Sequence, residues 1–490
     1  MRIAVIGSGL GGLAAAIRLR ALGHRVTVFE QRSVPGGRAS TFAKDGFTFD
    51  AGPTILTAPH LIDELFAAGG ERREELVELV RLDPAYNIRF PDESVFHYFT
   101  DAEALRAEVE RFSPGDVAGY DAFSRAATRI FRAGMALIDT PFHSPLTMLR
   151  AAPALALLRA DRSVADLAIR HFRDERLQRV FSFHPLLVGG NPFTTTSVYA
   201  LIHRLEQEWG VWFARGGTGA LVRALVTTFE RIGGRMEYEA CVTEILTDTR
   251  SRRATGVRLA TGRSHAADAV VCNADVAQTH LSLLPKTVRR RWTDARVRHM
   301  RQSMSLFVLY FGTKGTYPGV AHHEILMGQS YRELLRDIFG GGPLSGDFSL
   351  YLHRPTATDS SLAPPGCDAF YALVPVSHLG ADIDWQEAGP WLRDAIVDRL
   401  DATLLPELKG RITAESSVDP RYFRDTLGAY LGNGFSFQPT FRQSAWFRPH
   451  NRSEDVANLY FCGAGTHPGA GVPGVISSGK IVANLIGPSE

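Results

Sequence analysis

The spacing of hydrophobic residues changes twice near the start of the chain. Residues 3–6, Ile-Ala-Val-Ile, form a continuous apolar run, which is typical of a parallel strand buried on both faces. Residues 10–21 then place apolar side chains on one face of a helix, and residues 26–29 return to a strand pattern. The pattern therefore predicts a βαβ unit, with a glycine-rich turn at 7–12 between the first strand and the helix.

The glycines of that turn have different expected roles. Gly7 permits the tight turn, Gly9 lets the backbone approach a pyrophosphate, and Gly12 lets the helix pack closely on the strand. Glu30, at the end of the second strand, is placed to accept hydrogen bonds from a ribose, which disfavours a 2′-phosphate. We therefore predict a dinucleotide site that does not take NADP. A glycine-rich turn without a ligand is the alternative.

Two segments just downstream extend this site. Residues 35–38, Pro-Gly-Gly-Arg, would carry backbone amides and a cation to a pyrophosphate, through Gly37 and Arg38. Residues 49–54 form another turn of small residues that would bring the backbone close to a flavin ring, through Gly52, Pro53 and Thr54. Together the two segments predict FAD rather than NAD.

The C-terminal region returns to the same cofactor. Residues 459–480, LYFCGAGTHPGAGVPGVISSGK, combine a short apolar strand, a run of glycine and proline, and a helix expected from Gly474. So many glycines favour close approach to a flat cofactor, with the helix N-terminus directed at the flavin pyrimidine edge. An ordinary turn before a terminal helix is the alternative. The expected contacts are Gly463, Gly465, Thr466, Gly474 and Val475.

Two central segments resemble further parts of the cofactor domain. Residues 215–219 open an amphipathic helix, and residues 236–273 alternate like a small set of strands. Val242 and Asn273 lie at strand positions that could touch the adenine and the flavin, respectively. A role in the core is the alternative for each.

Helical spacing dominates from about residue 100 to residue 180. Within this region, residues 148–159 form an apolar stretch with arginines at its ends, too short to cross a bilayer. It could lie on a membrane surface with its arginines reaching the headgroups. A plain buried helix is the alternative.

These patterns predict an α/β fold with a discontinuous Rossmann-like FAD-binding domain, an α+β substrate domain and a helical, membrane-facing subdomain. The FAD-binding domain is expected to comprise residues 1–85, 214–280 and 455–490. The substrate-binding domain is assigned to residues 86–107, 181–213 and 281–454, and the helical subdomain to residues 108–180.

Composition excludes several classes of function. The 490 residues include 54 basic and 52 acidic ones, so no overall field favours nucleic acid. The four cysteines and 16 histidines form no metal-ligand motif, which predicts no metal, no disulfide framework and a reducing, cytoplasmic compartment. Because no nucleophile motif occurs either, the chemistry is assigned to the flavin.

Two other patterns leave alternatives open. Residues 286–301 contain seven basic residues opposed only by Asp294, which favours a solvated helix face, with binding to anionic lipid as the alternative. Aromatic and apolar residues recur at 181–188, 209–213 and 305–311. These stretches would either line a hydrophobic cavity or fill a core.

Over almost its whole length the chain closely resembles the bacterial-type phytoene desaturases of carotenoid biosynthesis, a group within the amine oxidase-like flavoproteins. The resemblance rests on FSFHPLLVGGNPF at 181–193, EWGVWFARGGTGALV at 208–222, SLFVLYFG at 305–312, DFSLYLHRPTATDSSLAP at 347–364, QSAWFRPHNR at 443–452 and GAGTHPGAGVPGV at 463–475.

The resemblance implies successive dehydrogenations of 15-cis-phytoene to lycopene, with FAD as the only redox cofactor. It also implies that phytoene and its desaturated intermediates enter from a membrane lipid surface, and that oxygen or a quinone reoxidises the flavin. The protein is then expected to be peripherally membrane-associated. Arg150 is the candidate acid/base residue, although this chain has Thr147 where relatives can carry an acidic residue. A structural or lipid-facing role is the alternative for Arg150.

Three other functions remain open. The first is a related desaturase that acts on diapophytoene or a hydroxylated intermediate, or that stops after fewer steps. The second is a flavin-dependent carotenoid isomerase, which would catalyse no net redox change. The third is a lipid-carrying module that has lost the flavin.

Overall fold

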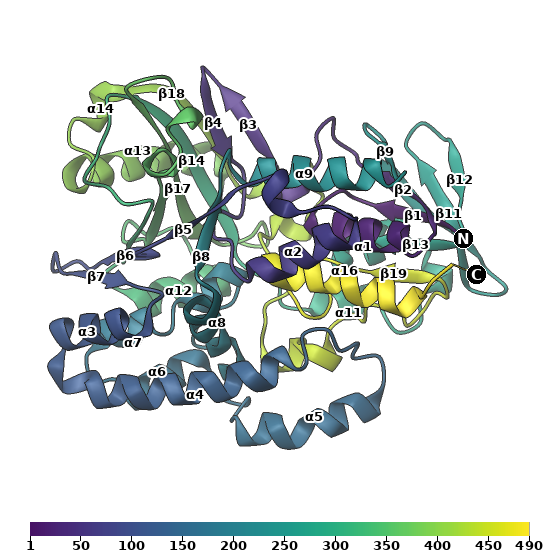
Figure 1. Cartoon of the computed structure of the whole chain (residues 1–490), viewed down its shortest axis with the longest axis horizontal. Coiled ribbons are helices and arrows are strands. Elements are labelled where there is room, and N and C mark those ends of the chain that lie inside the picture. Colours follow the sequence, from purple (N-terminus) through teal and green to yellow (C-terminus); the bar gives the residue numbers. More distant parts are fainter. Residues whose placement is uncertain (490) are drawn as a thin grey trace.

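The computed structural model describes residues 1–489, so Glu490 of the expected FAD-binding domain lies outside the described residues. The same holds for the side chains at 151, 154, 155 and 157 in the stretch expected to face a bilayer. Figure 1 shows three regions: a sheet with both chain termini on the right, a second sheet at the upper left, and a layer of helices along the bottom.

The first sheet is parallel and has five strands, which confirms the Rossmann-like part of the predicted fold. It is assembled from distant parts of the chain, in the order β19 (Leu459–Phe461), β13 (Ala269–Cys272), β1 (Arg2–Ile6), β2 (Arg25–Phe29) and β9 (Arg235–Glu237).

Alternation along β1 explains why both faces of this sheet are covered. Ile3 and Val5 join a core formed with the helices α1 (Leu10–Ala21), α2 (Pro59–Ala68), α9 (Thr218–Arg231) and α16 (Val472–Ile486). Ala4 and Ile6 face the antiparallel strands β10 (Val242–Asp248), β11 (Arg253–Leu259) and β12 (Ser264–Ala266). The helix α16 begins two residues before the expected Gly474, because Pro473 is well suited to the first helical turn.

Two antiparallel pairs connect the first sheet to the second. They are β3 (Thr41–Lys44) with β4 (Phe47–Asp50), and β5 (Leu79–Leu82) with β8 (Val211–Ala214).

The second sheet has seven strands and is mixed, because one of its strand pairings is parallel and the others are antiparallel. Its order is β18 (Ile412–Val418), β14 (Ser305–Lys314), β17 (Cys367–Val376), β16 (Leu350–His353), β15 (His323–Leu326), β6 (Tyr86–Arg89) and β7 (Val95–Tyr98). The helices around it are α8 (Leu201–Trp209), α12 (Tyr331–Gly340), α13 (Trp385–Thr403), α14 (Leu408–Arg411) and α15 (Pro420–Asp425).

The strand β14 shows what the apolar stretch at 305–311 does. Phe307, Leu309 and Phe311 pack in the same core as residues of α13. The alternate residues Leu306, Val308 and Tyr310 point to the other face, where they line a cavity. Because successive strand residues point to opposite faces, the two interpretations of this stretch are both correct.

The helical layer contains α3 (Ala102–Phe112), α4 (Val117–Met135), α5 (Pro145–Leu157), α6 (Val164–His171) and α7 (Glu175–Val180). Asp101 caps α3, and Ser163 with Asp166 forms a capping box at α6. On α5, the side chains of Leu146 and Leu149 are 64% and 72% exposed. Among the described residues, no helix is both long and apolar enough to cross a membrane.

The segment just after the expected domain boundary at residue 280 packs with the first sheet. Residues 281–300 follow the short helix α10 (Val276–Gln278) and include the helix α11 (Asp294–His299). They pack against the first sheet, because Trp292 and Val297 share a core with Ile6. More of the basic side chains in this segment form ion pairs with acidic residues than the sequence indicates. Arg289 is buried against Asp294, 2.7 Å away, and Arg291 lies 2.6 Å from Glu454. These pairs favour a structural role over lipid binding.

Candidate functional site

A single cavity of about 870 Å³ runs between the two sheets. This is at the large end of the range for ligand pockets, roughly 300–1,000 Å³. One part of its wall is made of the glycine-rich loops at the ends of β1, β13 and β19, and another part is made of apolar side chains from the second sheet and α8. The loops and the apolar walls therefore belong to one continuous site.

The structure brings most of the predicted cofactor residues together. Those that line the cavity are Gly7, Gly9, Glu30, Gly37, Arg38, Gly52, Pro53, Thr54, Val242, Asn273, Gly463, Gly474 and Val475. They come from four separate stretches of the chain, and the parallel order of the first sheet explains their convergence, since the carboxyl ends of its strands meet at one edge.

Three predicted residues do not line the cavity. Gly12 is buried where an added Cβ would lie 2.1 Å from the Gly7 carbonyl oxygen, so its role is the helix packing expected for it. At Gly465 an added Cβ would lie 2.6 Å from the Val276 side chain. Thr466 is fully buried, and its hydroxyl donates to the Pro449 carbonyl at 2.7 Å. The last two residues therefore lie outside the cavity wall, and the expectation that they contact FAD stays a prediction.

Close backbone approach is built into the cofactor end of the cavity. A Cβ atom at Gly9 would lie 2.8 Å from Asn273 Nδ2, and one at Gly11 would lie 2.7 Å from Asn273 Oδ1. At Gly52, a Cβ atom would lie 1.8 Å from the Arg38 carbonyl oxygen. At Gly11 and Gly52 the neighbours include backbone atoms, so only glycine fits there, whereas a Cβ atom at Gly9 would have to displace the Asn273 side chain. The loops can therefore present backbone amides to a flat, phosphate-bearing ligand.

Glu30 lies at the end of β2 and holds the neighbouring loop. Its Oε2 accepts hydrogen bonds from the Ser8 amide at 3.0 Å and the Ser8 hydroxyl at 2.6 Å. Its Oε1 accepts one from the Arg32 amide at 3.0 Å. Each carboxylate oxygen can accept two hydrogen bonds, so Oε2 is fully used and Oε1 keeps capacity for a ribose hydroxyl. The carboxylate therefore fits an adenosine ribose while it fixes the turn after β1.

Arg38 supplies a cation to the same end of the cavity. Its Nη2 donates to the Asn433 carbonyl at 3.3 Å, whereas its buried Nε has no hydrogen-bond partner among the described residues. Burial lowers the pKa of Arg38, and the Asp275 carboxylate partly opposes this effect. A buried guanidinium with a free donor is suited to an anionic ligand, so Arg38 fits the pyrophosphate of FAD.

Arg150, the candidate acid/base residue, lies elsewhere. It is exposed on α5 and does not line the cavity, although its neighbour Met148 does. This position favours the structural or lipid-facing alternative, and the catalytic role of Arg150 stays a prediction.

The apolar end of the cavity contains a row of hydroxyls that sequence reasoning missed. The Thr54 hydroxyl lies 2.8 Å from the Tyr351 hydroxyl and 3.1 Å from the Tyr371 hydroxyl, and all three residues line the cavity. Tyr371 also donates to the Gly52 carbonyl at 3.3 Å. Polar groups in an otherwise apolar wall are well placed to act on a bound substrate.

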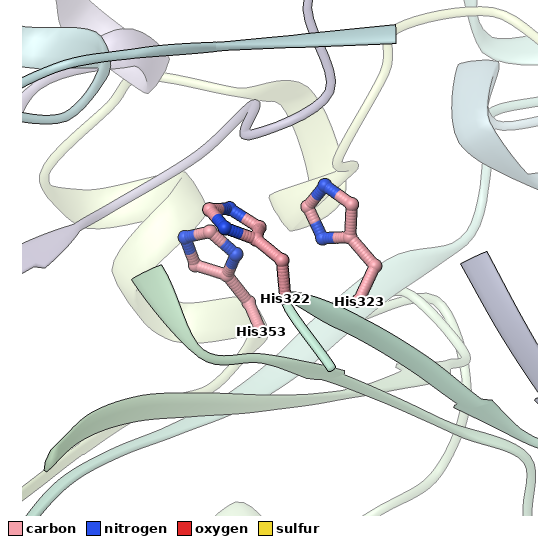
Figure 2. A group of neighbouring side chains, drawn as sticks. All are labelled: His322, His323 and His353. Carbon is pink, nitrogen blue, oxygen red and sulfur yellow. The ribbon is translucent and has the colours of Figure 1, made fainter. Parts of the chain in front are cut away.

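Three buried histidines, His322, His323 and His353, lie close together in Figure 2, and His323 Nδ1 is 2.6 Å from the Tyr351 hydroxyl of this row. Their ring nitrogens lie within 4.8 Å of one another, a spacing that could hold a metal ion. Burial lowers the pKa of each ring, to about 3 for His353. The expectation of no metal, based on motifs, did not consider this cluster because His353 lies on a different strand from the adjacent His322 and His323, and it stays a prediction.

Asp50 lies beside the cluster at the end of β4. Its Oδ2 is 3.9 Å from His353 Nε2, and its Oδ1 accepts a hydrogen bond from the Thr218 amide at 2.7 Å. Burial raises the pKa of the Asp50 carboxyl to about 7, although hydrogen bonds from the amides of Thr218 and Gly219 act in the opposite direction. Asp50 therefore titrates near neutral pH beside His353, one residue before the cavity-lining Ala51.

Comparison with solved structures shows the fold. The chain matches an oxidoreductase from Methanosarcina mazei with a TM-score of 0.64 and 19% identity, over 99% of this chain and all of that one. It matches putrescine oxidase with bound putrescine with a TM-score of 0.65 and 14% identity, over 99% of each chain.

Sequence comparison shows the family. The model of the flavin-containing amine oxidoreductases matches residues 10–487. A lycopene-forming phytoene desaturase from Pseudescherichia vulneris is 49% identical over 98% of each chain. A neurosporene-forming phytoene desaturase from Cereibacter sphaeroides is 47% identical, over 99% of this chain and 94% of that one. These matches confirm the predicted FAD cofactor, and the chain belongs to the flavin-containing amine oxidoreductase family and, within it, to the phytoene desaturases.

Proposed function

We propose that this FAD-dependent carotenoid desaturase converts 15-cis-phytoene to lycopene by successive dehydrogenations. The observation that carries the proposal is the continuity of the cavity, in which the glycine-lined cofactor end opens directly into apolar walls. Lycopene-forming relatives at 49% and 48% identity support the product. FAD supplies the acceptor for the hydride that leaves an allylic carbon.

The protein's own part is to bind, orient and desolvate a long hydrocarbon. Leu306, Val308, Ile325 and Leu373 line the cavity from neighbouring strands of the second sheet. A polyene of this length contributes about 0.8 kcal/mol for each buried CH₂ group, so an apolar cavity binds it without polar anchors. The same walls exclude water from the site of hydride transfer.

Substrate of this kind dissolves in lipid, and we propose a membrane-facing entrance at α5. This helix exposes Leu146 and Leu149, and it contacts the short turn Ala445–Phe447. Met148 and Ala445 line the cavity, while Phe447 is exposed nearby. Both α5 and the turn Ala445–Phe447 therefore carry an exposed apolar side chain and a residue that lines the cavity. A membrane quinone or oxygen would reoxidise the flavin.

Fewer desaturation steps are the second candidate for the product. The neurosporene-forming relative from Cereibacter sphaeroides is 47% identical, and a ζ-carotene-forming relative from Myxococcus xanthus is 38% identical. These identities are close enough to the lycopene-forming ones that the number of steps must be measured.

The test is incubation of the holoenzyme with phytoene in liposomes, followed by separation of the products. Lycopene as the end product supports the proposal. Accumulation of neurosporene or ζ-carotene identifies fewer steps, and turnover of diapophytoene but not phytoene identifies another substrate. A product with the same number of double bonds as phytoene would identify an isomerase.

A further inference from the structure

We propose that two adjacent histidines, His323 and His322, carry the proton lost by the substrate from the hydroxyl of Tyr351 out to the protein surface. The inference rests on the proposed desaturation, because each dehydrogenation releases a proton inside an apolar cavity. It also accounts for a cluster of buried histidines that cofactor binding does not use.

The path begins at the cavity wall. Tyr351 lines the cavity from β16, and its hydroxyl lies 2.6 Å from His323 Nδ1. The same hydroxyl lies 2.8 Å from the Thr54 hydroxyl, which holds it in place. Tyr351 is thus the point at which the apolar cavity has a hydrogen-bonded connection to the histidine cluster.

The path continues through the two histidine rings. Their centroids are 4.5 Å apart, and ring nitrogens of the cluster lie within 4.8 Å of one another. Nε2 of His322 and Nε2 of His323 are buried and have no hydrogen-bond partner among the described residues. A water molecule hydrogen-bonded to both rings would complete this part of the path, since buried polar atoms without partners are where such water is found.

The path ends near the surface. His322 Nδ1 lies 2.7 Å from the Thr358 hydroxyl. Thr358 is half-buried in the segment after β16, next to the exposed Ala357. Each ring therefore uses Nδ1 for a hydroxyl at one end of the path, and its Nε2 stays available for transfer between the rings.

The resting charge of the rings suits transfer. Burial lowers the pKa of His323 and His322 well below the usual value, and the neighbouring His353 lowers both further. The rings are therefore neutral at neutral pH, with one nitrogen that accepts and one that donates. A proton that enters is not retained, because the charged ring is disfavoured.

The proton balance is complete. The hydride, with two electrons, leaves one allylic carbon for FAD. The C–H bond on the neighbouring carbon breaks, its electron pair forms the new double bond, and its proton goes to the Tyr351 oxygen as the Tyr351 hydroxyl proton passes to His323. His323 passes a proton to His322, and His322 releases one to solvent. The products are the desaturated carotenoid, reduced FAD and one proton.

The experiment is anaerobic single turnover of the holoenzyme with carotenoid in liposomes, followed by flavin absorbance and a pH indicator. Tyr351→Phe, His323→Gln and His322→Gln are expected to slow flavin reduction and proton release by about 100-fold, the usual contribution of a proton-transfer group. Substrate affinity is expected to stay unchanged. Tyr317→Phe is the matched control, because it removes a hydroxyl bonded to the Pro406 carbonyl on the other side of the second sheet.

A second measurement separates transfer from mere packing. In His322→Gly, small bases added to the solution should restore the rate in proportion to their basicity, whereas a packing defect would respond to their size. Flavin absorbance of each purified variant shows that it has folded.

Rates within twofold of wild type in all three variants would overturn the inference. So would one equivalent of transition metal in the wild-type holoenzyme that is lost in His323→Gln, because the cluster would then be a metal centre. If wild type does not reduce its flavin with phytoene, the proposed substrate is wrong, and the same variants are tested with the carotenoid that the desaturase accepts.

Discussion

Asn273 lies directly against Gly9: a Cβ atom added at position 9 would stand 2.8 Å from the side-chain nitrogen of Asn273. The contact joins the first glycine-rich loop to the end of β13, which pairs with β1 in the parallel sheet. The pyrophosphate end of the cavity thus depends on residues from two separate segments of the cofactor domain.

Gly9→Val is therefore predicted to abolish FAD binding. The new side chain would displace Asn273 and fill the space through which the backbone approaches the cofactor. The purified variant, reconstituted with FAD and desalted, should show no flavin absorbance. Gly319→Val is the control, since an added Cβ there has no neighbour within 4 Å. Normal flavin content in Gly9→Val would contradict the assignment of this loop.

Glu30→Ala is predicted to weaken FAD binding by roughly 10- to 100-fold, because hydrogen bonds to a charged group contribute about 1.5–3 kcal/mol. The variant loses the acceptor for Ser8 and Arg32 as well as the expected ribose contact. Fluorescence titration of the apoprotein with FAD measures the change. Glu110→Ala, on the exposed side of α3, is the control. An unchanged FAD dissociation constant would show that Glu30 serves only the fold.

The cofactor end of the site could be predicted well from the sequence, for a physical reason. Loops that approach a phosphate need glycine at set distances from a strand and a helix, so Gly7, Gly9 and Glu30 are local signals. Gly465 and Thr466 carry the same signal but do not line the cavity. Composition alone does not reveal which residues of a loop face the ligand.

The histidine cluster and the hydroxyl row could not be predicted in this way. Tyr351 and His353 are alternate residues of β16, whereas His323 is on β15, and their proximity depends on the register of the sheet. Both faces of these strands are buried, so the hydrophobic pattern does not indicate which face lines the cavity. The packing of Trp292 in the core that contains Ile6 was not predicted for a similar reason, since it depends on tertiary contacts.

Asp50 gives a prediction for the pH dependence of stability. Its pKa is about 7 in the folded protein, above its usual value of 3.8, so the folded state binds this proton more tightly than the unfolded state. The resulting stabilisation is complete below about pH 4 and is lost as the pH rises through about 7. Compared with Asp50→Asn, the wild-type protein should therefore lose thermal stability between these pH values.

Melting temperatures of both proteins across this pH range test the point, with the difference between them as the readout. Because other titrating groups are common to both proteins, their contributions largely cancel. A difference that stays constant with pH would show that the Asp50 carboxyl does not titrate in this range.

The exposed leucines of α5 give a prediction for membrane binding. Leu146→Glu with Leu149→Glu should lower the partition onto liposomes by at least about 10-fold, since each buried leucine contributes roughly 1.5–3 kcal/mol. Sedimentation with liposomes measures this change. Trp391→Glu is the control, because Trp391 is 44% exposed on α13, which lies far from α5 in Figure 1. Equal losses in both proteins would place the membrane contact elsewhere.

Desaturation of phytoene by the bound flavin is the central claim, and anaerobic reduction tests it most directly. Holoenzyme mixed with 15-cis-phytoene in liposomes, without oxygen or quinone, should lose its oxidised flavin absorbance and form one equivalent of a carotenoid with one more double bond. Addition of a quinone should then carry the product to lycopene. Flavin that stays oxidised in the presence of phytoene, in a protein with full FAD content, would contradict the account.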